Sequence, residues 1–244
     1  MIIAIEGLNA SGKKTQSTIL QQYRKDSVLF SFPRHDGPFA DVISRSLRRE
    51  SVVYRRQRDN QGNYKYSYDS EDDTIALRGL FALDQYEASE EIKAHDAAGK
   101  LVILDRYWPS NVCYGAEDGL PMEVLSSLSS SLPAADLYVY LDVPVSSLLR
   151  RQPVAEDRYG SDRSKLSRIR KRYIDLWHKY MKSCHDHTLV LSPPIWVIIN
   201  GHRSLGDVTS QIVHWIDLIK AADGGSLLVT TGSKQLKRQA TRKT

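Results

Sequence analysis

Five short apolar runs set the hydrophobic pattern of this chain, and each has the length of a β-strand. The runs Leu101–Leu104 and Ile195–Ile199 are not interrupted by any polar residue. Such runs are typical of parallel strands that are covered on both faces. The predicted strands cover about residues 2–6, 28–32, 101–105, 136–142 and 195–199.

The segments between the apolar runs carry apolar residues at helical spacing. The longest extends over residues 71–97, and Gly99 follows it as a helix-ending glycine. Strands that alternate with helices predict an α/β fold with a five-stranded parallel sheet and helices on both faces. We expect helices from Lys13 onward, over residues 38–49, 71–97 and 121–132, from Pro144 to about Arg151, and over 163–182 and 205–221.

The first apolar run leads into a glycine-rich turn, Gly7 to Gly12, and Lys13 opens the helix that follows. Strand, glycine loop, lysine and helix in this order form the arrangement of a P-loop. Its backbone N–H groups and the helix N-terminus can bind polyphosphate, and the lysine adds a mobile positive charge. A turn that binds nothing is the alternative, but the flanking strand and helix favour the P-loop. The predicted ATP-binding residues are Gly7, Leu8, Asn9, Ala10, Ser11, Gly12, Lys13, Lys14 and Thr15.

Charged residues follow the ends of the other predicted strands. Arg34 follows the second strand, Asp105 and Arg106 the third, and Asp142 ends the fourth. Ligands of parallel α/β sheets lie beyond the carboxyl ends of the strands, so these residues should meet near the P-loop.

Composition adds bounds on the class of protein. The 244 residues suit a single large domain, which we place at residues 1–223. The net charge of +5 equals the charge of residues 234–244, which hold five basic residues and no acid, so the remainder is neutral. We therefore expect a basic, disordered tail over residues 224–244; a weak contact of this tail with nucleic acid is the alternative. The chain has only two cysteines, which favours a reducing compartment, the cytoplasm. It has no apolar run of membrane-spanning length, so we expect no membrane partner.

Residues 50–72 interrupt the α/β pattern. Tyr64, Tyr66 and Tyr68 alternate as in a strand, with residues 60–63 as a hairpin turn, and nearby arginines could stack on bases. We favour the simpler reading, a polar surface excursion.

In order and spacing, residues 1 to about 180 resemble the thymidylate kinase family, the P-loop enzymes that phosphorylate dTMP. The resemblance does not cover residues 50–72 or the tail. The motifs that carry it are Glu6–Thr15, Phe32-Pro33-Arg34, Phe81–Ser89, Asp105–Asn111, Asp136–Asp142, Arg151 and Arg158-Tyr159.

The resemblance implies ATP as donor, Mg²⁺, a homodimer and conversion of dTMP to dTDP for dTTP supply. Lys13 would bind the donor phosphates, and guanidinium groups suit the acceptor phosphate because they bind it with two hydrogen bonds. The polar segment 152–162 would be a lid. The implied roles are these: Arg34 and Arg106 at the acceptor phosphate; Asp105 beside Arg106 and, with Thr15, at the metal; Arg151 and Arg158 at the transferred group; Phe81 stacked on the base; Tyr159 against the sugar 2′ position; Ser110 and Tyr114 lining the pocket.

Three positions depart from the family pattern. Lys14 stands where a hydroxyl would bind Mg²⁺. Asn9 stands where the family usually has an aspartate that meets the acceptor sugar or phosphate, and Gln85 stands where it usually has an arginine that faces the pyrimidine edge. A glutamine amide can donate a hydrogen bond to thymine or accept one from cytosine. Monophosphates other than dTMP are therefore also considered as phosphoryl acceptors. The alternatives are a deoxynucleoside kinase with Glu6 as base, a nucleotide-binding protein without turnover, and an interaction protein that uses its basic tail.

Overall fold

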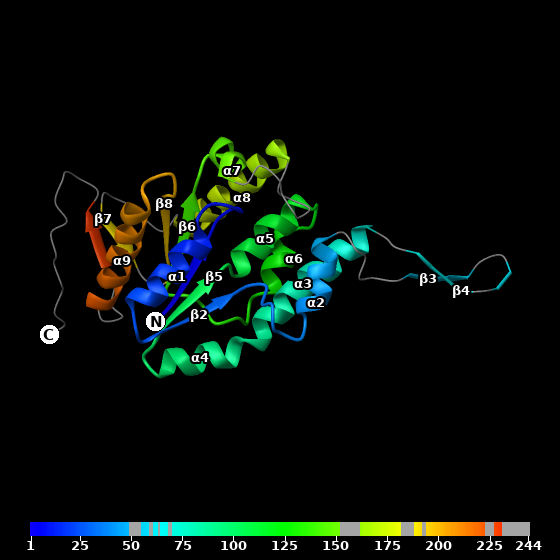
Figure 1. The fold of residues 1–244 in the computed structure, drawn as a ribbon, viewed down its shortest axis with the longest axis horizontal. Helices are drawn as coiled ribbons and strands as arrows, with labels where there is room; N and C mark the ends of the chain where they lie inside the picture. The colour runs from blue at the N-terminus through cyan, green and yellow to red at the C-terminus, as the bar shows by residue number, and fades with distance from the viewer. Residues whose placement is uncertain are drawn as a thin grey trace.

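Five parallel strands form the central sheet of the molecule (Figure 1). The computed structural model describes residues 1–48, 55–58, 61–62, 64–67, 70–151, 162–181, 188–191, 194–222 and 227–230. The strand order is β2-β5-β1-β6-β8, so the P-loop strand is central, as expected for a doubly wound sheet. The strands are β1 (Ile2–Glu6), β2 (Ser27–Ser31), β5 (Leu101–Asp105), β6 (Leu137–Asp142) and β8 (Ile195–Asn200).

Helices cover both faces of this sheet, which confirms the predicted fold class. Helices α1 and α9 pack together on one face, while α4 lies against β5 and α8 against β8 on the other. The helices are α1 (Lys13–Tyr23), α2 (Ala40–Leu47), α3 (Ser70–Glu87), α4 (Ser89–Ala97), α5 (Trp108–Glu117), α6 (Met122–Ser127), α7 (Val145–Arg151), α8 (Arg163–Met181) and α9 (Leu205–Ala221).

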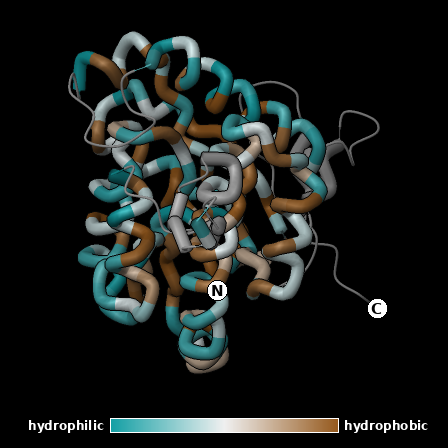
Figure 2. Tube along the Cα trace, turned by 90° about the vertical axis from the view of Figure 1, so that its right-hand side faces the viewer, coloured by the Kyte–Doolittle hydropathy of each residue, from teal (hydrophilic) through white to brown (hydrophobic). Residues whose placement is uncertain are grey.

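The core forms because the strands are apolar on both faces. Every residue of β1 and β5 is buried, and in Figure 2 hydrophobic positions gather inside the fold while hydrophilic ones line its outer turns. On the α8 face, Trp196 of β8 stacks on Tyr138 of β6 with ring centroids 4.2 Å apart. Among the described helices, none is long and apolar enough to span a membrane.

Three helices differ from the sequence prediction. The helix expected over 71–97 is divided at Ala88 into α3 and α4. The helix expected over 121–132 is confined to Met122–Ser127, whereas α5, which immediately follows Asp105-Arg106-Tyr107, was not predicted at all. Pro109 lies near the start of α5 and would argue against a helix there, because proline breaks helices in their interior. Proline is nevertheless well tolerated in the first helical turn.

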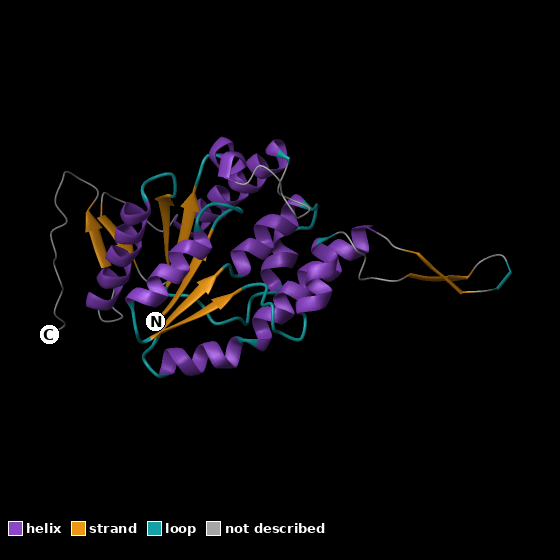
Figure 3. Cartoon of the chain, in the orientation of Figure 1, coloured by secondary structure: helices purple, strands orange, loops and turns teal. Residues whose placement is uncertain are grey.

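Two small antiparallel sheets lie outside the central sheet. Strands β3 (Arg55–Arg58) and β4 (Tyr64–Ser67) form a hairpin that projects from the body beyond α2 and α3 (Figure 3), so the alternating tyrosines Tyr64 and Tyr66 do lie in a strand. Strand β7 (Thr188–Leu191) pairs with β9 (Leu227–Thr230). The prediction of a disordered tail from residue 224 is therefore wrong for residues 227–230, while residues 231–244 lie outside the described residues.

Candidate active site

The P-loop follows β1 and bends tightly at Gly7. The φ angle of Gly7 is +149°, and a Cβ atom there would lie 2.6 Å from Ser11 Oγ and 3.0 Å from the carbonyl oxygen of Leu141. Only glycine fits this position without displacing the loop. Gly12, with φ +99°, then turns the chain into α1. The predicted strand, loop and helix are thus present in the expected geometry.

A broad cavity opens in front of the P-loop, and we call it the donor cavity. Residues 9–16 line one side of it, and Lys13 donates from Nζ to the carbonyl oxygen of Leu8 at 2.7 Å. The opposite side is formed by the end of α7 and by the loop after β8. The other lining residues are Asp105, Arg106, Arg151, Gly201, Arg203, Leu205 and Val208. Basic groups dominate this lining, as polyphosphate binding requires.

Arg151, the last residue of α7, closes one edge of the donor cavity. Its Nη1 donates to the carbonyl oxygen of Ala10 at 3.1 Å, and its Nη2 donates to that of Gly201 at 3.2 Å. It therefore joins the P-loop to the loop after β8. The remaining predicted lid residues, Arg158 and Tyr159 within segment 152–162, lie outside the described residues.

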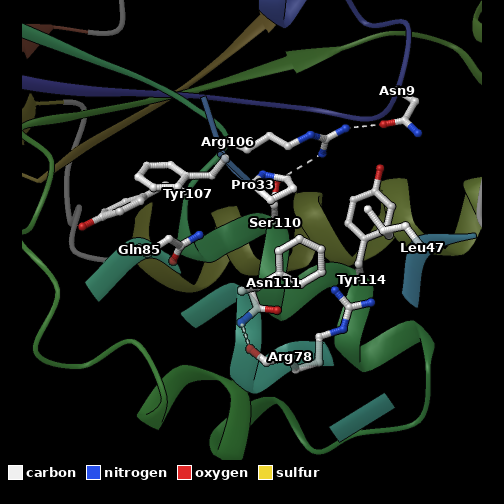
Figure 4. A pocket seen from close by; sticks show the side chains of 12 residues that line it. Asn9, Pro33, Leu47, Arg78, Gln85, Arg106, Tyr107, Ser110, Asn111 and Tyr114 are labelled. Carbon is white, nitrogen blue, oxygen red and sulfur yellow. Dashed lines mark hydrogen bonds between the residues drawn. The ribbon is translucent and has the colours of Figure 1, made fainter. Parts of the chain in front are cut away.

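A second, partly apolar cavity lies beside the first, and we call it the acceptor pocket (Figure 4). Apolar and aromatic side chains line it together with a few polar groups, as is usual for small-molecule sites. The pocket brings together six predicted substrate residues, which are Asn9, Phe81, Gln85, Arg106, Ser110 and Tyr114. The other lining residues are Phe32, Pro33, Leu47, Arg78, Tyr107 and Asn111.

Asn9 and Arg106 line both cavities and form the wall between them. A hydrogen bond joins Arg106 Nη2 to Asn9 Oδ1, and Figure 4 shows the two side chains pointing toward each other. Arg106 also donates from Nη1 to Ser110 Oγ at 3.4 Å and stands over the ring of Tyr114. The backbone φ angle of Arg106 is +66°, a value that residues with a side chain rarely adopt. Such unusual backbone conformations occur most often at functional sites.

Glu6 is buried next to this wall and supports it through hydrogen bonds. Its carboxylate accepts hydrogen bonds from the backbone N–H of Tyr107 at 2.7 Å, from Ser110 Oγ at 2.6 Å and from the Tyr173 hydroxyl at 3.2 Å. Burial raises the pKa of Glu6 to about 7, although the Ser110 hydrogen bond and the charge of Arg106 lower it. Glu6 lines neither cavity, so it is a supporting group rather than an accessible base.

Arg34 is placed differently from the other predicted acceptor residues. Its Nε donates to Asp84 Oδ1 at 3.1 Å, its backbone N–H donates to Asp84 Oδ2 at 2.9 Å, and its guanidinium also pairs with Glu87. Asp84 is fully buried. The structure thus uses Arg34 to join the loop after β2 to α3, and Arg34 is outside the lining of both cavities.

Sequence reasoning missed four residues at the site. Asp84 holds Arg34, Arg78 and Asn111 form the far end of the acceptor pocket, and Arg203 faces the donor cavity. The spacing of Arg78, Phe81 and Gln85 at i, i+3 and i+7 on one predicted helix was the signal that could have identified Arg78.

The donor cavity has one carboxylate that suits a metal ion. Asp105 Oδ1 is buried and accepts no hydrogen bond from the described residues. Thr15 is exposed on the first turn of α1, and Lys14 is exposed beside it. The described residues contain no group of three His, Cys, Asp or Glu side chains that could hold a metal. One carboxylate fits Mg²⁺, because this ion binds phosphate and water oxygens as readily as protein ligands.

Comparison with known proteins agrees with this geometry. The family model described as thymidylate kinase matches residues 5–212. A probable thymidylate kinase of Pyrococcus horikoshii is 31% identical over 215 residues, which cover 86% of this chain and 93% of the relative. The thymidylate kinase of Schizosaccharomyces pombe is 28% identical over 217 residues, 87% of this chain and 89% of the relative.

The solved structures add a match in fold. The thymidylate kinase of Candida albicans superposes with a TM-score of 0.67 at 20% identity, over 94% of this chain and 97% of that chain. The solved structure shows the shared fold, and the family model together with the 31% identical relative shows that this chain belongs to the thymidylate kinase family.

Proposed function

We propose that this protein transfers the γ-phosphoryl group of ATP to a 5′-phosphate oxygen of dTMP and releases ADP and dTDP. Membership of the thymidylate kinase family supports the reaction. The structural observation that carries the proposal is the common wall of Asn9 and Arg106, which separates a basic donor cavity from an aromatic acceptor pocket. Two anionic nucleotides bound in these cavities would present their phosphates to each other at this wall.

The residues at the wall suit this transfer because phosphoryl transfer depends on positioning and positive charge. Lys13 binds the β- and γ-phosphates, and Arg106 binds the acceptor phosphate from the other side. Arg151 neutralises charge on the transferred group, with Arg158 joining it from segment 152–162. Phe81 stacks on the base, Gln85 meets the base edge, and Ser110 and Tyr114 contact the nucleoside. Tyr159 limits the sugar 2′ position.

We further propose that Mg²⁺ accompanies ATP. Asp105 would hold it, with Thr15 as a second contact, and the ion would neutralise phosphate charge when bound. Lys14 adds a fixed positive charge at the position where a hydroxyl is usual.

A deoxynucleoside kinase is not favoured. That reaction needs a base at an uncharged hydroxyl, whereas Glu6 is buried beneath the wall and engaged by Ser110 and Tyr173. Arg106 at the wall instead suits an acceptor that already carries a phosphate.

An assay of ADP release tests the reaction. The purified protein receives ATP and Mg²⁺ with dTMP, dUMP, dCMP, dGMP or thymidine as acceptor. We expect ADP with dTMP and none above background with thymidine. ADP formation with thymidine alone would overturn the monophosphate assignment, and ATP binding without turnover of any acceptor would support a protein that only binds nucleotides.

We also propose a homodimer and a reducing, cytoplasmic setting. Helix α3 exposes Ile75 (57%) and Leu83 (50%), large apolar side chains that a second copy could cover. The reducing setting rests on the two cysteines of the chain, one of which, Cys113, is free and buried.

A further inference from the structure

A buried ion pair forms the far end of the acceptor pocket. Arg78 of α3 donates from Nη2 to Asp118 Oδ2 at 2.6 Å, at the C-terminal end of α5. The side chains of both residues are only 3% exposed, yet Arg78 lines the pocket. Charged groups are rarely placed in such a position unless they are paired, because desolvation is costly.

The position of Arg78 is fixed from three directions by α5. Asn111 donates from Nδ2 to the backbone carbonyl oxygen of Arg78 at 3.0 Å. One turn further along α5, Gly115 leaves room for the aliphatic part of the Arg78 side chain, since a Cβ atom at Gly115 would lie 3.1 Å from Arg78 Cδ. Asp118 then holds the guanidinium. A side chain fixed in this way has little freedom to turn away from the pocket.

This guanidinium lies at the end of the pocket opposite the phosphate wall. Asn9 and Arg106 mark the phosphate end, and in Figure 4 Arg78 and Asn111 lie at the other end, with the ring of Tyr114 between Arg106 and Arg78. The Arg78 guanidinium is 5.5 Å from the centre of the Phe81 ring. A nucleotide with its phosphate at the wall and its base stacked on Phe81 would have its base within reach of Arg78.

We propose that Arg78, held by Asp118, selects acceptor nucleotides whose base has a carbonyl oxygen at its outer edge. A guanidinium only donates hydrogen bonds. Thymine and uracil offer an acceptor, O4, at this edge, whereas cytosine offers an amino group. Two donors would face each other with dCMP. Gln85 can turn its amide to suit either base, so it cannot provide this discrimination alone.

The proposal rests on the proposed reaction and is tested by the ratio of kcat/KM for dTMP to that for dCMP. The double variant Arg78→Gln with Asp118→Asn replaces the Arg78–Asp118 ion pair with two neutral amides, so neither residue is left as an unpaired buried charge. Lys165, which also pairs with Asp118 at 3.7 Å, has a side chain that is 23% exposed to solvent. We expect the ratio to fall at least tenfold, mainly through a higher KM for dTMP. Arg78→Lys, which still only donates, should retain the preference.

Arg168→Gln is the matched control. Arg168 pairs with Glu117, the neighbour of Asp118, but its side chain is 55% exposed and it lies outside both cavities. An unchanged ratio in the folded double variant, or a wild type that prefers dCMP, would overturn the inference while leaving monophosphate kinase activity standing. If the wild type phosphorylates no monophosphate, the proposed function fails, and calorimetric binding of dTMP and dCMP to wild type and double variant tests Arg78 independently.

Discussion

At the scale of single residues, the buried carboxyl group of Glu6 links three elements that make the site. It bonds to α5 through Ser110, to α8 through Tyr173 and to the chain after β5 through the N–H of Tyr107. Its pKa of about 7 means that this group changes charge near neutral pH, directly below Arg106.

Glu6→Gln should change how stability depends on pH. The unfolded carboxyl ionises near pH 4.5, while the folded one holds its proton to about pH 7. The folded state therefore binds more protons between these values, and the free energy of unfolding falls as the pH rises through them, by roughly 3 kcal/mol. Glutamine imitates the neutral acid, so the variant should lack this fall. Urea denaturation at pH 5, 6, 7 and 8 measures it; equal pH dependence in both proteins would contradict the argument.

Gly7→Ala should impair ATP binding by at least about tenfold, because the added methyl group would collide with Ser11 Oγ and the Leu141 carbonyl oxygen. Gly79→Ala is the control. Gly79 is in α3 with free space around its Cβ position, so alanine should leave binding unchanged and stabilise the helix by up to ~1 kcal/mol. Calorimetric titration with ATP measures the difference, with circular dichroism to establish folding. Normal affinity in Gly7→Ala would show that the loop adapts.

At the scale of elements, the sequence predicted the central sheet well because its strands are apolar on both faces. It also predicted the P-loop, whose glycines and lysine are local in sequence. Helix α5 could not be predicted in the same way. Its residues are nearly all buried, so its sequence lacks the polar face that marks a surface helix. The family resemblance implied that Arg34 binds the acceptor phosphate, whereas its pairing with Asp84 depends on a contact 50 residues away that the sequence pattern does not reveal.

The β7–β9 sheet provides an element-scale prediction. Ending the chain at residue 222 removes β9, whereas ending it at residue 231 keeps β9 and removes the five basic residues of the tail. Because every described residue that lines the two cavities precedes residue 209, both truncations should retain kcat and the KM for dTMP. Only the shorter protein should lose stability, by a few degrees in Tm, through the lost strand pairing. A large loss of activity in either would show that the C-terminal segment contributes to the site.

At the scale of the whole molecule, the proposed homodimer predicts a particle of about 55 kDa, twice the 27.7 kDa of one chain. Ile75→Asp should yield a monomer at micromolar concentration, because a charge in an apolar interface is strongly unfavourable. Tyr23→Asp is the control, since Tyr23 is 67% exposed on α1 rather than α3. Light scattering measures the mass. A wild-type monomer, or a dimer that persists in Ile75→Asp, would contradict this interface.

The wall of Asn9 and Arg106 has a thermodynamic consequence for the whole enzyme. One guanidinium faces both nucleotide sites, so a ligand in either cavity changes the electrostatic free energy of the other. Such coupling is reciprocal: whatever factor an unreactive ATP analogue imposes on the dissociation constant of dTMP, dTMP must impose on that of the analogue. With Arg106 shared between the two proposed sites, we expect the binding of the two substrates to be coupled. The order in which they bind alters the path but not the total free energy of the ternary complex.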